Sequence, residues 1–81
     1  MKAFVYVTLK KSVLDPQGKT IQGALKKLGY SSVSDVRQGK YFDISLAAGA
    51  DHDKAIAELD QISREVLSNP VIEEYRLEIL D

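Results

Sequence analysis

The triplet Gly18-Lys19-Thr20 is the part of this sequence that most resembles nucleotide-binding chemistry. It could end a phosphate-binding loop, whose pattern G-x-x-x-x-G-K-[ST] lies between a strand and a helix. The first glycine of that pattern would fall at Val13, and a β-branched residue fits poorly in a tight turn around phosphates. We therefore interpret the triplet as the start of a helix, with Lys19 in solvent.

Other catalytic chemistry has few residues to use. The single histidine, His52, lies between Asp51 and Asp53, and we interpret it as a solvated surface residue. The chain has no cysteine, which excludes a cysteine nucleophile, a thiolate metal site and a disulfide. We therefore predict no catalytic, no metal-binding and no cofactor-binding residue in this chain.

Composition favours one small soluble domain over residues 1–81. The chain is 44% apolar and 28% charged, with a net charge of −1, so it has no general attraction for nucleic acid or anionic membrane. No apolar run reaches membrane-spanning length, and the first residues do not resemble a signal peptide. We expect a cytoplasmic protein with a small core, for which association with a partner would add stability.

The first half of the chain predicts a strand followed by a helix. Residues 2–10 alternate between apolar and more polar positions with the period of a strand. Asp15 can cap the following helix, Pro16 suits its first turn, and Gly29 suits its end. The helix carries one apolar stripe, formed by Ile21, Ala24, Leu25 and Leu28.

The second half predicts two short strands, a helix and a last strand. The segments 32–38 and 40–47 form a hairpin around Gly39, although Val33 and Val36 cannot both point inward without a bulge. A helix then begins near Asp51 and Asp53 and ends before residues 69–70, and residues 71–80 form a strand. Inward positions are predicted at Phe42, Ile44, Leu46, Ala55, Ile56, Leu59, Ile62, Val66, Leu67, Val71, Tyr75, Leu77 and Ile79.

The resulting order β-α-β-β-α-β predicts an α+β fold of the ferredoxin-like type. Such a sandwich has a four-stranded antiparallel sheet with two helices on one face. Its open face would display Phe4, Tyr6 and Tyr41. RNA-recognition motifs stack bases on aromatic residues at similar places, but the stretch from Arg37 to Asp43 lacks their spacing. We therefore predict that another copy of the chain covers these aromatic residues.

Three short motifs give the chain a likeness to a known family. They are Leu14-Asp15-Pro16-Gln17-Gly18, Leu28-Gly29 and Val36-Arg37-Gln38-Gly39-Lys40. With these motifs, the whole chain resembles the PurS family, the small subunit of multi-subunit phosphoribosylformylglycinamidine synthase. The resemblance implies a homodimer or tetramer without catalytic residues, which joins a glutaminase subunit to a large synthase subunit. It also implies that ATP and magnesium are used by the complex, and that ammonia passes between the two active sites.

The motifs themselves suggest a docking surface for these partners. A solvated helix cap needs only Asp15, whereas the longer pattern also includes Gln17 and Gly18, and Arg37 and Lys40 flank the predicted hairpin turn. The alternative function is a free-standing regulatory module of ferredoxin-like fold that binds a small ligand at its dimer interface. Neighbouring genes for a glutaminase and a synthase would favour the assembly subunit.

Overall fold

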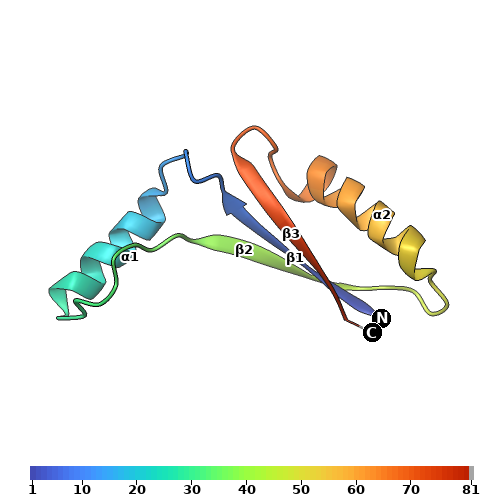
Figure 1. Cartoon of the computed structure of the whole chain (residues 1–81), viewed down its shortest axis with the longest axis horizontal. Helices are drawn as coiled ribbons and strands as arrows, with labels where there is room; N and C mark the ends of the chain where they lie inside the picture. The colour runs from blue at the N-terminus through green and yellow to red at the C-terminus, as the bar shows by residue number, and fades with distance from the viewer. Residues whose placement is uncertain (81) are drawn as a thin grey trace.

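The computed structural model describes residues 1–80, which form an α+β fold with one antiparallel sheet. The sheet has three strands in the order β2-β1-β3 (Figure 1). In chain order the elements are β1 Lys2–Leu9, α1 Pro16–Lys27, β2 Gly39–Ser45, α2 His52–Ile62, the π-helical turn η1 Ser63–Leu67 and β3 Glu73–Leu80.

The central strand β1 supplies the best-buried side chains of the core. Ala3, Val5 and Val7 are almost fully buried, as the alternating pattern of this strand predicts. Both neighbours of β1 run antiparallel to it, and the register pairs Lys2 with Leu80. The beginning and the end of the described chain therefore lie side by side at one end of the sheet (Figure 1).

The helix α2 covers the face of the sheet on which Val5 and Val7 lie, which we call the inner face. Ala55 and Leu59 are the buried residues of α2. The hydroxyl of Tyr75 on β3 also donates a hydrogen bond of 2.7 Å to the Asp60 carboxylate on α2. Helix and sheet are thus joined by apolar packing and by a polar contact.

The π-helical turn η1 changes which side of the second helix faces the sheet. We predicted that Ile62 and Val66 face inward, but Val66 is 74% exposed and Ser63 is fully buried instead. The Ser63 hydroxyl donates to the carbonyl oxygen of Leu59 at 2.7 Å, which satisfies it inside the core. A π-turn has more residues per turn than an α-helix, so it shifts the apolar stripe out of phase.

Capping residues set both ends of α1 as the sequence predicts. Asp15 is the N-cap, and its carboxylate accepts a hydrogen bond from the Gly18 backbone N–H at 2.9 Å. At the other end Gly29 adopts φ 93°, and the Tyr30 N–H donates to the Leu25 carbonyl at 3.0 Å.

The predicted position of α1 on the sheet is wrong. Gly18 is its only buried residue, and Leu28 of the apolar stripe is 73% exposed. Figure 1 shows α1 pointing away from the sheet, at the opposite end of the molecule from α2. The chain measures 51 × 26 × 14 Å, with a radius of gyration of 16.2 Å. A compact domain of this length has a radius of gyration of about 12 Å, so α1 is a projecting arm.

The predicted strand before Gly39 is also absent from residues 1–80, so their sheet has three strands rather than four and only α2 covers its inner face. Residues 31–38 run back along α1 instead. The Gln22 side chain donates to the Ser34 carbonyl at 2.7 Å, and Lys19 lies 3.9 Å from Asp35. These contacts hold the segment beside the helix and away from the sheet edge.

The last strand is shorter than predicted. Val71, expected to point inward, lies before β3 in a turn and is 77% exposed. Tyr75, Leu77 and Ile79 do share the inner face, in register with Val7, Val5 and Ala3. Among the described residues 1–80, no helix is long and apolar enough to cross a membrane.

Candidate functional site

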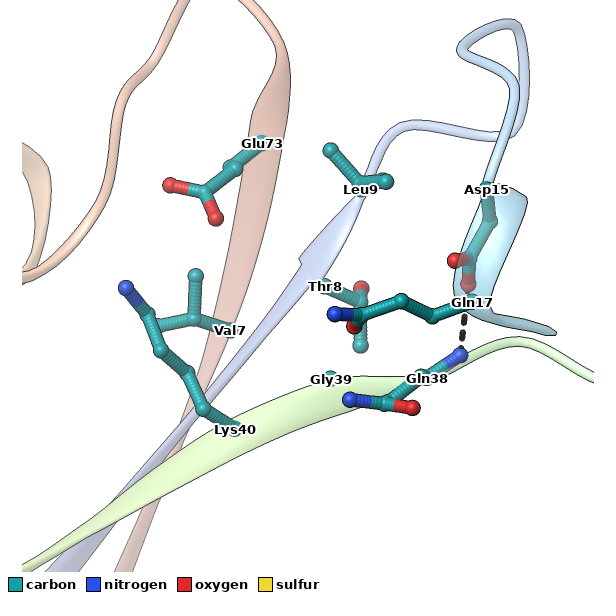
Figure 2. A pocket seen from close by; sticks show the side chains of 9 residues that line it. All are labelled: Val7, Thr8, Leu9, Asp15, Gln17, Gln38, Gly39, Lys40 and Glu73. Carbon is teal, nitrogen blue, oxygen red and sulfur yellow. Dashed lines mark hydrogen bonds between the residues drawn. The ribbon is translucent and has the colours of Figure 1, made fainter.

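The buried carboxylate of Asp15 joins two segments that are far apart in the sequence. Asp15 is 3% exposed. One carboxylate oxygen accepts from the Gly18 N–H at 2.9 Å. The other accepts from the Gln38 N–H at 2.6 Å, as Figure 2 shows. One side chain therefore caps α1 and fixes the chain directly before β2.

These hydrogen bonds stabilise the charged form of Asp15. Donation from the Gly18 N–H is the largest cause that lowers the pKa of Asp15 below its ordinary value, followed by donation from the Gln38 N–H. The positive charge of Arg37 acts in the same direction, whereas burial opposes it. The folded chain thus favours the ionised form of Asp15, which accepts hydrogen bonds from the backbone N–H groups of Gly18 and Gln38.

Gly18 is required by the close approach of the two segments. A Cβ atom at this position would lie 2.1 Å from the Val36 carbonyl oxygen and 2.9 Å from an Asp15 carboxylate oxygen. Both distances are shorter than real Cβ contacts. The motif from Leu14 to Gly18 and the motif from Val36 to Lys40 are therefore in direct contact in the folded chain.

Arg37 is exposed and makes hydrogen bonds within the chain. Its Nη2 atom donates to the carbonyl oxygens of Lys10 and Val13, both at 2.9 Å. These carbonyls belong to the loop between β1 and α1. Of the five residues that we predicted to bind partners, Asp15, Gly18 and Arg37 therefore hold the local fold.

Gln17 and Lys40, the other two, line an open hollow of about 270 Å³ (Figure 2). Gln38, which belongs to the motif from Val36 to Lys40, and Glu73, which belongs to none of the three motifs, line it too. Glu73 begins β3, so only the pairing of the strands reveals its place. The hollow is lined by Val7, Thr8, Leu9, Asp15, Gln17, Gln38, Gly39, Lys40 and Glu73.

The predicted aromatic cluster forms on the outer face, which is the face of the sheet opposite α2. Phe4, Tyr6 and Tyr41 lie with ring centroids 5.9–6.3 Å apart. The guanidinium of Arg76 stacks 4.3 Å from the Tyr6 ring centroid, and the Tyr6 hydroxyl donates to Glu78 at 3.0 Å. Tyr41 remains 65% exposed, so the cluster presents an aromatic surface.

Neither sequence feature with possible catalytic chemistry forms an active site in the described residues. The Thr20 hydroxyl donates to the Pro16 carbonyl at 2.9 Å, and the Gly18 N–H is already used by Asp15. His52 is an exposed residue that lies 3.4 Å from Asp53. Residues 1–80 contain no group of three or more histidine or acidic side chains arranged to hold a metal ion.

Comparison with known proteins gives a match over nearly the whole chain. The family model "PurS: Phosphoribosylformylglycinamidine (FGAM) synthase" matches residues 2–81. The chain belongs to the PurS family. The PurS subunit of this synthase from Synechocystis sp. is 48% identical over 75 residues, which cover 93% of this chain and 74% of the relative.

Solved PurS structures share the fold as well as the sequence. PurS of Methanocaldococcus jannaschii, a subunit of formylglycinamide ribonucleotide amidotransferase in the purine biosynthetic pathway, superposes with a TM-score of 0.83 at 39% identity. That match covers 95% of this chain and 92% of the other. A chain in the structure of PurLQS from Thermotoga maritima gives a TM-score of 0.84 at 31% identity, covering 98% and 96%.

The contact at Gly18 predicts opposite effects for two glycine substitutions in α1. Gly18→Ala should lower the free energy of unfolding by about 1–3 kcal/mol, because the methyl group would collide with the Val36 carbonyl. Gly23→Ala is the matched control, since a Cβ at Gly23 meets nothing within 4 Å. It should raise stability by about 0.5–1 kcal/mol, because alanine favours a helix interior.

Urea unfolding of both variants and the wild type, at one protein concentration, measures this difference. Equal stability of the Gly18→Ala and Gly23→Ala variants would show that the two motifs do not pack against each other.

Proposed function

We propose that this chain is the non-catalytic PurS subunit of phosphoribosylformylglycinamidine synthase in purine biosynthesis. In this role it bridges a glutaminase subunit and an ATP-dependent synthase subunit in the cytoplasm, and it supports the transfer of ammonia between them. The family match over residues 2–81 carries the proposal. The near-complete superposition on a chain of PurLQS supports the assembly role.

The chemistry of the chain agrees with an accessory role. A glutaminase of the cysteine type needs a thiolate nucleophile, and the sequence contains no cysteine. An ATP site needs a loop that cradles phosphates, and the only candidate pattern has Val13 in place of its first glycine. We therefore assign ATP and magnesium to the synthase subunit of the complex. The alternative is a regulatory module that binds a small ligand at its dimer interface, and the open hollow beside Gln17 and Lys40 is one of several hollows that such a ligand could use.

The arm gives a physical reason for a homodimer. The chain exposes 5926 Å², whereas a compact protein of 9.0 kDa exposes about 4,900 Å². The excess, about 1,000 Å² on each chain, is similar to the area that each partner buries in a specific interface of standard size. In the proposed dimer, the apolar stripe of each α1 packs on the partner's inner face beside β2, where Phe42 and Ile44 are only partly buried. The second copy would then supply the second helix layer that the sequence predicts.

The outer face offers a second surface for association. Three aromatic rings gather on it, with Lys2 and Asp43 paired at 3.4 Å beside them. Aromatic residues are enriched at interface centres. We propose that Phe4, Tyr6 and Tyr41 join two dimers into a tetramer.

Contacts with the other subunits are assigned to the rim of the hollow. Gln17 and Lys40 are exposed there. Asp15, Gly18 and Arg37 support this surface from within, because they fix the backbone on which the two side chains stand.

The assembly role predicts a result for reconstitution. The purified chain alone should hydrolyse neither ATP nor glutamine, and it should restore glutamine-dependent turnover when mixed with the glutaminase and synthase subunits. Steady-state assays of each subunit alone and of the mixture measure this, with the heat-denatured chain as control. Turnover by the isolated chain above that control would contradict the role.

Charge reversal at the hollow tests the partner surface. Lys40→Glu should weaken assembly with the two other subunits by roughly tenfold or more while leaving the fold intact, because a rim charge mainly affects recognition. Lys54→Glu on α2 is the matched control, as Lys54 is also exposed and lies outside this hollow. Equal binding of both variants in a titration with the two partners would remove Lys40 from the contact.

Substitutions that introduce a charge on one or the other proposed self-association surface should give oligomers of different mass. Leu28→Lys places a charge in the apolar stripe and should give monomers at micromolar concentration. Tyr41→Lys should stop assembly at the dimer. Light scattering of the folded variants measures both masses.

Gly23→Lys is the control for α1, because Gly23 lies on the side of the helix away from the stripe and should not change the mass. An unchanged mass for Leu28→Lys would exclude the proposed dimer, in which α1 of each copy packs on the inner face of the other. An unchanged mass for Tyr41→Lys would show that the outer face does not join copies of this chain.

A further inference from the structure

We propose that Asp15 and Arg37 form a lock that fixes the direction in which the arm leaves the sheet, and thereby selects a closed dimer. The arm consists of α1 and the returning segment, residues 16–38. This inference rests on the proposed exchange of α1 between two copies.

Packing against the sheet does not hold the arm in place. Within α1, Gly18 at its base is the only buried residue. The direction of the arm therefore depends on its two connections to the sheet, which we call the crossings. Residues 10–15 lead from β1 into the arm, and residues 36–39 lead from the arm into β2. Without contacts between them, the two crossings would act as a hinge.

Hydrogen bonds from two side chains tie these crossings together. Asp15, on the way into the arm, accepts from the Gln38 N–H on the way out at 2.6 Å. Arg37, on the way out, donates to the carbonyls of Lys10 and Val13 on the way in at 2.9 Å. Each crossing thus contributes one side chain that is hydrogen-bonded to the backbone of the other crossing.

Each end of the lock is also fixed to the sheet. Gln38 directly precedes Gly39, which pairs with Thr8 of β1. Lys10 directly follows β1, and its N–H donates to the Ile72 carbonyl at 2.9 Å. Rotation of the arm about its base would therefore break several hydrogen bonds at once.

The lock matters because an exchanged element can assemble in several ways. Where the fixed angle places α1 on a second copy by a two-fold operation, each arm rests on the other copy and the assembly closes as a dimer. An arm on a loose hinge can fold back on its own sheet or join copies into open chains. Hydrogen bonds that hold one angle disfavour both alternatives.

The experiment compares Asp15→Asn and Arg37→Met with the wild type. The side chain introduced by Asp15→Asn can still cap α1, but its amide group would face the Gln38 N–H with a second donor. The Met side chain removes both carbonyl contacts of Arg37 and retains much of its apolar stem. Asp35→Asn is the matched control, because it removes only an exposed contact with Lys19 within the arm.

Spin labels measure the direction of the arm. The chain has no native cysteine, so Lys27→Cys on α1 and Glu74→Cys on β3 can be labelled selectively. Each labelled variant is refolded with an excess of unlabelled chain, so that only distances within one chain are detected. Circular dichroism confirms that the sheet and helices are retained.

A single narrow distance distribution is expected for the wild type and for Asp35→Asn. Asp15→Asn and Arg37→Met should broaden it and add a shorter distance, and light scattering should show monomers and larger species beside the dimer. Unchanged distances in both folded variants would overturn the lock while leaving the exchange intact. A monomeric wild type would instead overturn the exchange, and the lock as a selector of dimers with it. Arg37→Met leaves the Asp15 cap in place, so it decides the question if Asp15→Asn does not fold.

Discussion

The Asp15 carboxylate must satisfy two backbone N–H groups that lie far apart in the sequence, those of Gly18 and Gln38. It can do so only if the start of α1 and the start of β2 meet, and they meet closely enough to leave no space for a side chain at position 18. A carboxylate taken out of water without such donors strongly destabilises a fold. The path of the chain between residues 10 and 39 follows from this constraint.

The molecule therefore has two parts that are stabilised in different ways. The sheet and α2 bury apolar side chains on the inner face, as small domains usually do. The arm buries almost none within its own chain and is held by polar contacts at its base. Such a division is typical of a subunit whose remaining apolar surface is covered when it assembles.

Patterns local in sequence predicted much of the fold. The alternation in β1, the cap at Asp15 and the stop at Gly29 are each encoded within a few residues, and all three are confirmed. The direction of α1 was predicted wrongly because its stripe shows only that the helix needs an apolar partner, and does not show that this partner lies in the same chain.

The other differences also arise from contacts that local patterns do not encode. A strand was expected over residues 32–38 because this segment and residues 40–47 resemble the two halves of a hairpin around Gly39. Contacts with α1 hold the segment elsewhere. The burial of Ser63 depends on a π-turn, which the 3.6-residue period of an ordinary helix cannot reveal. In the candidate site, the sequence shows the motif residues, but the contacts of Asp15 with Gln38 and of Arg37 with Lys10 and Val13 join segments far apart in the chain and appear only in the folded structure.

The neighbouring positions of Lys2 and Leu80 have a consequence for covalent connection. Both ends of the described chain lie at the same end of the sheet, far from the arm (Figure 1). A short linker could therefore join one copy to the next in tandem, or close the chain into a ring, without disturbing the arm. Gene duplication and fusion of this fold would then require few additional residues, and a circular permutant opened in the turn after Ser45 would keep every strand intact.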